Sequence, residues 1–162
     1  MMKLVERTRP ALTAVSLFAL MSVAAHGLAA DEADAVNAAH DAYHKAFGTE
    51  DMGLMAESWV QDETARLIVP PGKKIFTGWE EVKAEFEGAF EFLDVLSLGS
   101  KDAQVIVGEE IAWIVDVHEL EMRTDDGEVI KPEFFSTHVF HKVDGRWLMI
   151  QHQASAQPAP EE

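Results

Sequence analysis

The feature of this sequence that most constrains its fold is a hairpin signal near the carboxyl terminus. Residues 134–142 and 147–153 are rich in Phe, Val, Ile, Thr and Trp, and the pair Asp144-Gly145 stands between them. Asp-Gly is a preferred sequence for a two-residue turn between antiparallel strands. Because an isolated hairpin is only marginally stable in water, the rest of the chain must supply further strands and a helical cover.

The residues upstream of the hairpin predict helices followed by long strands. Apolar residues recur at helical spacing over residues 31–47, a shorter helix is expected after Asp51, a good N-cap, and a third helix opens at Gly78. Strands are predicted over residues 64–69, 75–77, 95–107 and 111–123. This order indicates an α+β fold with a mainly antiparallel sheet.

The amino terminus has the pattern of a secretory signal peptide. Basic residues precede an apolar run over residues 11–25, and small residues follow it. The run is shorter than the roughly 20 residues that a spanning helix needs, so an uncleaved membrane anchor is the less favoured alternative. We expect cleavage after Ala29 or Ala30, and export either to a bacterial periplasm or out of the cell.

Removal of residues 1–30 makes the charge of the chain more negative. It takes away three of the 13 basic residues and one of the 29 acidic residues, which leaves 10 and 28 and a formal net charge of −18. That charge argues against nucleic acid and anionic membrane surfaces as partners. The chain has no cysteine and therefore no disulfide. We expect one domain over residues 31–155 and a disordered tail over residues 156–162.

Several short motifs follow one another in order along this domain. They are Ser58-Trp59-Val60-Gln61-Asp62, Pro70-Pro71-Gly72, Gly78, Thr137, Lys142, Asp144-Gly145, Trp147 and Ser155. In this order they resemble the SnoaL-like group of the nuclear transport factor 2-like superfamily. The resemblance implies a curved, mainly antiparallel sheet wrapped around helices into a cone, a pocket at its open end, and a homodimer formed through the outer face of the sheet.

The sequence departs from that family pattern at three positions near the implied pocket. Relatives tend to carry Arg where this chain has Phe135, and His where it has Gln151 and Gln153. The resemblance implies that Thr137, Gln151 and Gln153 line the pocket, although a polar stripe at a dimer interface is nearly as good an explanation. The full set assigned to ligand binding is Tyr43, Trp59, Glu133, Phe135, Thr137, Gln151 and Gln153.

Strand alternation identifies a candidate catalytic pair. Asp116 and His118 point the same way along residues 111–123, together with Ile114 and Leu120. Apolar neighbours would raise the pKa of the carboxylate, and the imidazole would relay a proton, which suits proton abstraction from a carbon acid. The alternative is that the pair points outward on the dimer-forming face.

Histidines elsewhere give weaker signals. His40 and His44 share a helix face and could hold a metal ion, but no third ligand is evident in the sequence, so we expect neither a metal site nor a cofactor. On the final hairpin, strand alternation places His141 on the same face as Thr137 and places His138 on the opposite face. Periodicity leaves open which of these faces the pocket, because both faces are apolar.

Together these observations favour an exported binding protein. We expect a small, largely apolar, neutral or cationic molecule in the cone. One alternative is an isomerase, dehydratase or cyclase that uses Asp116 and His118 for proton transfer. Another is a dimeric association domain without chemistry.

Overall fold

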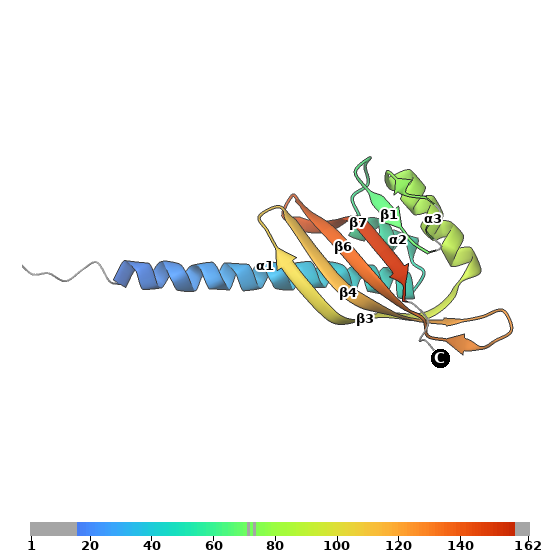
Figure 1. Cartoon of the computed structure of the whole chain (residues 1–162). Helices are drawn as coiled ribbons and strands as arrows, with labels where there is room; N and C mark the ends of the chain where they lie inside the picture. The colour runs from blue at the N-terminus through green and yellow to red at the C-terminus, as the bar shows by residue number, and fades with distance from the viewer. Residues whose placement is uncertain (1–15, 71, 73, 158–162) are drawn as a thin grey trace, which may run out of the picture.

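The computed structural model describes residues 16–70, 72 and 74–157, with side chains from Asp31 onward (Figure 1). Of the predicted signal peptide, residues 1–15 lie outside this description and residues 16–30 contribute only backbone. Most of the predicted tail, residues 158–162, also lies outside it. In the described part of the chain, no helix has the combination of length and apolar character that a membrane span requires.

Three helices precede the long strands, as the sequence predicts. They are α1 (Ser16–Gly48), α2 (Met52–Ser58) and α3 (Trp79–Phe92). The Asp51 carboxylate caps α2, because its Oδ1 accepts hydrogen bonds from the backbone N–H groups of Gly53 and Leu54 at 2.8 and 3.0 Å. Gly78 precedes α3 with a φ of 80°, a backbone conformation that favours glycine.

Seven strands form one sheet. They are β1 (Arg66–Ile68), β2 (Phe76–Thr77), β3 (Asp94–Val107), β4 (Ile111–Arg123), β5 (Val129–Ile130), β6 (Glu133–Val143) and β7 (Arg146–Ala156). Their order is β2-β1-β7-β6-β4-β3, and β5 pairs with β4. The pairing is antiparallel except between β1 and β7, which confirms the predicted α+β fold with a mainly antiparallel sheet.

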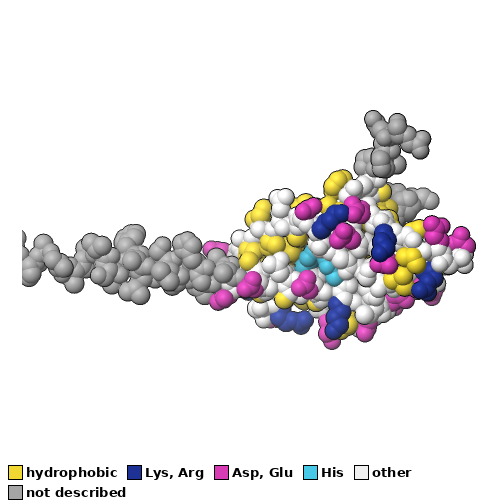
Figure 2. Space-filling model, turned by 90° about the horizontal axis from the view of Figure 1, so that it is seen from below, with side chains coloured by type: hydrophobic (Ala, Val, Ile, Leu, Met, Phe, Trp, Pro, Cys, Tyr) yellow, Lys and Arg dark blue, Asp and Glu magenta, His cyan; other side chains and the backbone are white. Residues whose placement is uncertain are grey.

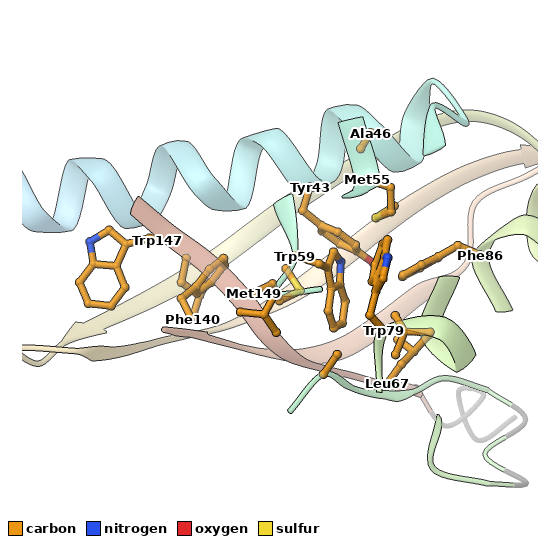
Figure 3. Close-up of a cluster of buried hydrophobic side chains, with 14 of the residues drawn as sticks. Tyr43, Ala46, Met55, Trp59, Leu67, Trp79, Phe86, Phe140, Trp147 and Met149 are labelled. Atoms are coloured by element: carbon orange, nitrogen blue, oxygen red, sulfur yellow. The ribbon is translucent and has the colours of Figure 1, made fainter. Parts of the chain in front are cut away.

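The core lies between the sheet and the helices. The long strands slope across α1, while α2 and α3 gather near β1 (Figure 1). Large side chains from every layer meet there, and most are fully buried (Figure 3). They include Tyr43, Met55, Trp59, Leu67, Phe86, Ile114, Phe140 and Met149. Burial of this apolar surface is the main force that holds α1 against the sheet.

Burial alternates along the strands and separates two faces of the sheet. On β4, Ile114, Asp116 and His118 are buried, whereas Trp113 and Val115 are 38% and 43% exposed. The inner face therefore lies under α1, and the outer face is open. Register shifts in the β3–β4 and β6–β7 pairs, between Lys101 and Gln104 and between Val139 and Phe140, increase local twist, as β-bulges do.

Candidate functional site

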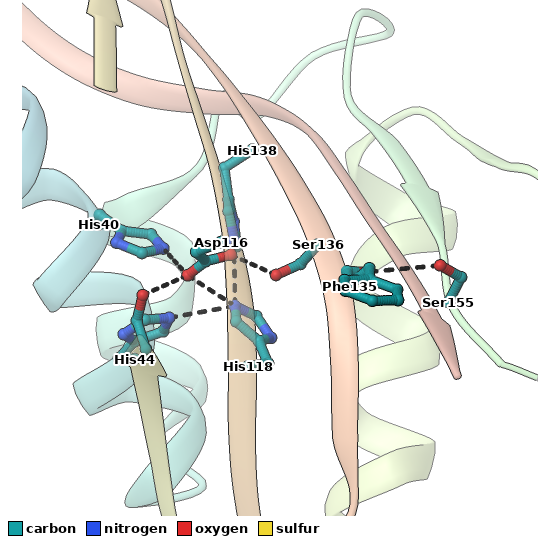
Figure 4. A network of polar contacts seen from close by, with 9 residues as sticks. His40, His44, Asp116, His118, Phe135, Ser136, His138 and Ser155 are labelled. Carbon is teal, nitrogen blue, oxygen red and sulfur yellow. Dashed lines mark hydrogen bonds and ion pairs between the residues drawn. The ribbon is translucent and has the colours of Figure 1, made fainter. Parts of the chain in front are cut away.

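Four histidines and one aspartate meet on the inner face of the sheet, beneath α1. Asp116 and His118 come from β4, and His138 comes from the neighbouring strand β6. His40 and His44 lie one turn apart on α1, on the side that faces the sheet. All five are buried, and each offers a ligand atom within 4.8 Å of the others (Figure 4). We call these five residues the histidine cluster.

The imidazole Nε2 atoms of this cluster point at one another and at the carboxylate. His118 Nε2 lies 3.2 Å from His44 Nε2 and 3.0 Å from His138 Nε2. Asp116 Oδ2 lies 3.4 Å from His40 Nε2, and Oδ1 lies 3.3 Å from His138 Nε2. His40 Nε2 nevertheless makes no hydrogen bond among the described residues. The polar atoms of the cluster therefore converge on one small volume.

The Asp116 carboxylate accepts hydrogen bonds from two hydroxyl groups. Ser100 Oγ on β3 donates to Oδ2, and Ser136 Oγ on β6 donates to Oδ1. Burial works to raise the pKa of Asp116, but the nearby imidazoles of His138 and His40, together with the Ser100 hydroxyl, outweigh it and hold the pKa well below its usual value. The carboxylate is therefore ionised although its side chain is completely buried.

Three histidines of the cluster, His44, His118 and His138, are neutral. Burial lowers the pKa of His44, His118 and His138 to about 3, although the nearby Asp116 charge works in the opposite direction. His152 on β7 lies opposite His138 in the register and is also buried, with its pKa lowered by burial and by His138. These imidazoles therefore bring no positive charge to the carboxylate.

A cavity of about 250 Å³ lies beside the histidine cluster. Its lining is mostly apolar, with polar groups from Tyr43, Glu85, His118 and His152; the apolar lining is Phe47, Leu67, Val69, Pro70, Phe86, Ala89, Leu93, Leu98, Leu120, Met122, Phe134 and Ala154. Burial, and then the Asp116 charge, raise the pKa of Tyr43, so its hydroxyl stays protonated. His118 is the member of the cluster that also lines the cavity.

The predicted pair Asp116 and His118 is brought together on the inner face, with His118 Nε2 3.8 Å from Asp116 Oδ2. Two parts of the proton-transfer expectation are nevertheless wrong. The pKa of Asp116 is lowered rather than raised, because hydrogen-bond donors surround the carboxylate in place of apolar walls. Asp116 also does not line the cavity, so only His118 of the pair reaches it.

The residues assigned to ligand binding are dispersed. Tyr43 lines the cavity, whereas Trp59 is part of the core. Glu133 forms an ion pair with Lys101 at the start of β6. Phe135, Thr137, Gln151 and Gln153 do not line the cavity, because they share the outer face of the sheet. The prediction that these four residues line the pocket is therefore wrong for this cavity, because strand alternation turns their side chains to the opposite face of the sheet.

The expectation that His40 and His44 lack further metal ligands nearby is wrong. Asp116, His118 and His138 supply ligand atoms from strands that are far away in the sequence. His138, His152, Ser100 and Ser136 were not assigned to a site from the sequence. A signal does exist for two of them, because Ser136 and His138 lie two residues apart on β6 and therefore share a face. To recognise that this face meets Asp116, however, the β4–β6 register must be known, which pairs Asp116 with Ser136.

Comparison with known proteins agrees with this fold. Residues 36–160 match the profile of the SnoaL-like domain. A protein of the NTF2-like family from Streptomyces avermitilis, provisionally named a dehydratase, superposes with a TM-score of 0.68 at 18% identity, over 78% of this chain and 96% of that one. No curated protein matches the chain significantly.

Two further solved structures illustrate how varied the similar proteins are. A ketosteroid isomerase-like protein from Erwinia carotovora atroseptica has a TM-score of 0.66 at 20% identity, over 79% of this chain and 98% of that one. A protein from Xanthomonas campestris, provisionally named a calcium/calmodulin-dependent protein kinase II association domain, has a TM-score of 0.66 at 22% identity, over 76% and 86%. At these identities the likeness establishes the fold alone.

Proposed function

The chain belongs to the SnoaL-like domain family, and from that premise we propose that its cavity binds a small, largely apolar molecule that is neutral or cationic. The observation that carries this proposal is the lining of the cavity, in which apolar side chains of α1, α3 and five strands accompany four polar ones. Ligand sites in proteins have this character, with a few polar groups that fix orientation within an apolar wall.

The size of the cavity restricts the ligand. Its volume of about 250 Å³ is slightly below the roughly 300–1,000 Å³ of typical ligand pockets, so it suits a molecule smaller than a drug-sized compound. Two solved relatives carry names of enzymes that act on small organic molecules, a dehydratase and an isomerase-like protein. Those names support the class of ligand and assign no reaction to this chain.

The polar groups of the lining restrict its charge. Glu85 brings a carboxylate, whereas no lysine or arginine is among the residues that line this cavity in the described part of the chain. The protonated Tyr43 hydroxyl can donate a hydrogen bond, and the neutral imidazoles of His118 and His152 can each donate or accept one. Such a lining favours a neutral or cationic ligand that carries one or two hydrogen-bonding groups.

An apolar fluorescent probe tests the proposal. We expect N-phenyl-1-naphthylamine to bind the full-length chain with enhanced fluorescence, and Ala89→Phe to weaken that binding at least about tenfold, because the new ring occupies the cavity. Ala84→Phe is the matched control, since Ala84 is exposed on the same helix, α3. The proposal fails if the probe does not bind, or if both variants bind it as the unchanged chain does.

We also propose that the chain forms a homodimer through the outer face of the sheet. Large apolar side chains are exposed there on three adjacent strands: Ile106 on β3, Ile111, Trp113 and Val115 on β4, and Phe135 on β6. Monomeric proteins rarely leave so continuous an apolar face in water. The solved relative from Xanthomonas campestris that is named an association domain supports an association role for this fold.

Export is the remaining part of the proposal. It rests on the basic start and the apolar run over residues 11–25. The intact mass of the chain recovered from the periplasm of an expressing bacterium checks it. We expect the mass of a chain that begins at Ala30 or Asp31. An uncleaved chain that stays in the cytoplasm would contradict the proposed export.

A further inference from the structure

The contacts of His118 cannot all be hydrogen bonds. Its Nε2 atom lies 3.2 Å from His44 Nε2 and 3.0 Å from His138 Nε2. A neutral imidazole nitrogen either donates one proton or accepts through one lone pair in the ring plane. Because that single proton or lone pair points in one direction, at most one of the two contacts can be a well-aligned hydrogen bond. A shared cation between the nitrogens removes this conflict, because each lone pair then points at the same positive charge.

The Asp116 carboxylate lacks a counter-charge. Its side chain is fully buried, and none of the described lysine or arginine side chains forms an ion pair with it. The hydroxyl groups of Ser100 and Ser136 solvate its oxygens, but they bring no positive charge. An isolated buried carboxylate is costly unless a cation or a metal ion accompanies it.

His40 supplies a third, independent sign. Its Nε2 atom is aimed into the cluster, 3.4 Å from Asp116 Oδ2, and the residue is only 4% exposed, yet this nitrogen has no hydrogen-bond partner among the described residues. A buried polar atom without a partner costs stability and calls for an explanation. A metal–nitrogen bond would satisfy it.

The spacing of these atoms is that of ligands around one ion. Four nitrogen ligands around Zn²⁺ at roughly 2.0–2.1 Å lie about 3.3 Å apart. The close contacts of the cluster, at 3.0, 3.2, 3.3 and 3.4 Å, fall near this value. The widest separation of 4.8 Å exceeds the roughly 4.2 Å across a five-coordinate ion, so the outermost atoms would each move inward by about 0.3 Å.

From these observations we propose that His40, His44, Asp116, His118 and His138 bind a divalent transition-metal ion beside the cavity. Imidazole nitrogens suit zinc, copper, iron and nickel, and one carboxylate with four imidazoles lacks the all-oxygen set that calcium and magnesium prefer. Ser100 and Ser136 orient the Asp116 ligand through their hydrogen bonds, the role of outer-shell partners in metal sites.

The metal site is distinct from the proposed apolar ligand site, although the two meet at His118. Four of the five ligands do not line the cavity. Loss of metal binding would therefore leave binding of an apolar probe in place, and the two proposals can fail separately.

Zinc binding by the full-length chain tests the site. The chain is purified with a tag that contains no histidine, stripped with EDTA, and equilibrated with Zn²⁺ by dialysis. We expect about one ion per chain, and we expect His44→Gln and Asp116→Asn each to weaken the binding by at least about 100-fold. His141→Gln is the matched control, because His141 lies on β6 outside the cluster and its loss should leave the affinity unchanged.

Two results would overturn the proposal. One is a stripped chain that takes up no zinc, copper, nickel or iron. The other is a folded His44→Gln variant that binds zinc as tightly as the unchanged chain, which would indicate adventitious surface binding. X-ray absorption of the zinc-loaded, unsubstituted chain needs no variant to fold. A shell of several imidazole nitrogens at roughly 2.0–2.1 Å is expected, and a shell of oxygen alone contradicts the site.

Discussion

At the scale of single residues, Asp116 organises the inner face of the sheet. Its two oxygens receive hydroxyl donors from β3 and β6 and face imidazoles from α1, β4 and β6 (Figure 4). Because the side chain is fully buried, each donor that is removed leaves part of an ionised group unsatisfied. The dependence of stability on these donors can be measured one hydroxyl at a time.

Ser136→Ala is the first such change. Ser136 is buried, and its hydroxyl donates to Asp116 Oδ1, so we expect its loss to reduce the free energy of unfolding by about 1–3 kcal/mol. Urea unfolding in the presence of EDTA measures this without any contribution from a metal. Ser155→Ala makes the same chemical change at an exposed position on β7 and should stay within about 0.5 kcal/mol of the unchanged chain. Equal effects of the two changes would show that the Asp116 contact is not stabilising.

Residue-level reasoning from the sequence recovers part of the site. Alternation along one strand correctly places Asp116 and His118 on the same face, and the structure shows that this face is the buried one. Alternation along one strand cannot predict the electrostatic surroundings of Asp116, because they are made by residues of other elements. These are Ser100, Ser136, His40 and His138. Whether a buried carboxylate meets apolar walls or hydrogen-bond donors decides the direction of its pKa shift, and that depends on tertiary contacts.

At the scale of elements, the hairpin with which the sequence analysis begins contains a one-residue irregularity. Val143 pairs with Arg146 at the turn, and an unbroken register would pair His138 with Gln151. The register instead shifts between Val139 and Phe140, so His138 pairs with His152. A shift of one residue exchanges the faces of every later side chain. This shift places Gln151 and Gln153 on the outer face.

Neither propensity nor alternation predicts such a bulge. The pocket assignment of the two glutamines follows from the family resemblance, and it does not hold for this cavity because both side chains lie on the outer face. The turn itself is a different case. Asp144 and Gly145 both have positive φ, 51° and 79°, as the type of turn expected for Asp-Gly requires. The conformation of the turn can therefore be predicted from its local sequence, whereas the position of a bulge depends on packing across the sheet.

Two glycines of the α3 region offer a matched test of backbone conformation. Gly78 has φ 80° and ψ 155°, which a side chain rarely tolerates, so Gly78→Ala should cost about 1–3 kcal/mol of stability. Gly88 lies inside α3 with open space around the position of a new Cβ, so Gly88→Ala should add about 0.5–1 kcal/mol. Thermal and urea unfolding measure both, and a shift of the same sign in both variants contradicts this account of the helix start.

At the scale of the whole molecule, the sequence is sufficient to predict the architecture. The order of helices and strands, the α+β class and the antiparallel hairpins are confirmed. The sequence does not reveal the parallel pairing of β1 with β7, or the approach of His40 and His44 on α1 to β4 and β6, because both join residues that are distant in the chain. The histidine cluster depends on those long-range contacts.

Charge is dispersed rather than concentrated on one face of the molecule. On the face shown in Figure 2, acidic and basic side chains are interspersed, and hydrophobic and histidine side chains appear between them. The excess of acidic residues therefore raises the net negative charge without forming one anionic field on this face. This face therefore offers no single charged patch to a partner of opposite charge.

The oligomeric state is the property of the whole molecule that is most open to test. We expect a dimer by sedimentation equilibrium and a weakening of association by at least about 30-fold when Phe135→Lys places a charge on the exposed apolar face. Val129→Lys is the control, because Val129 is a similarly exposed apolar residue on β5, outside that patch. A monomeric unchanged chain, or a Phe135→Lys variant that remains as dimeric as the control, contradicts the proposed interface.

The strict alternation of β4 has a consequence for how such a protein can diversify. Trp113 and Val115 belong to one face, and Ile114, Asp116 and His118 belong to the other, so adjacent codons specify side chains that never meet. Substitutions on the outer face can create or abolish self-association while the inner chemistry stays intact, and the reverse also holds. One strand can thus follow two independent evolutionary histories, provided that no insertion or deletion changes its frame.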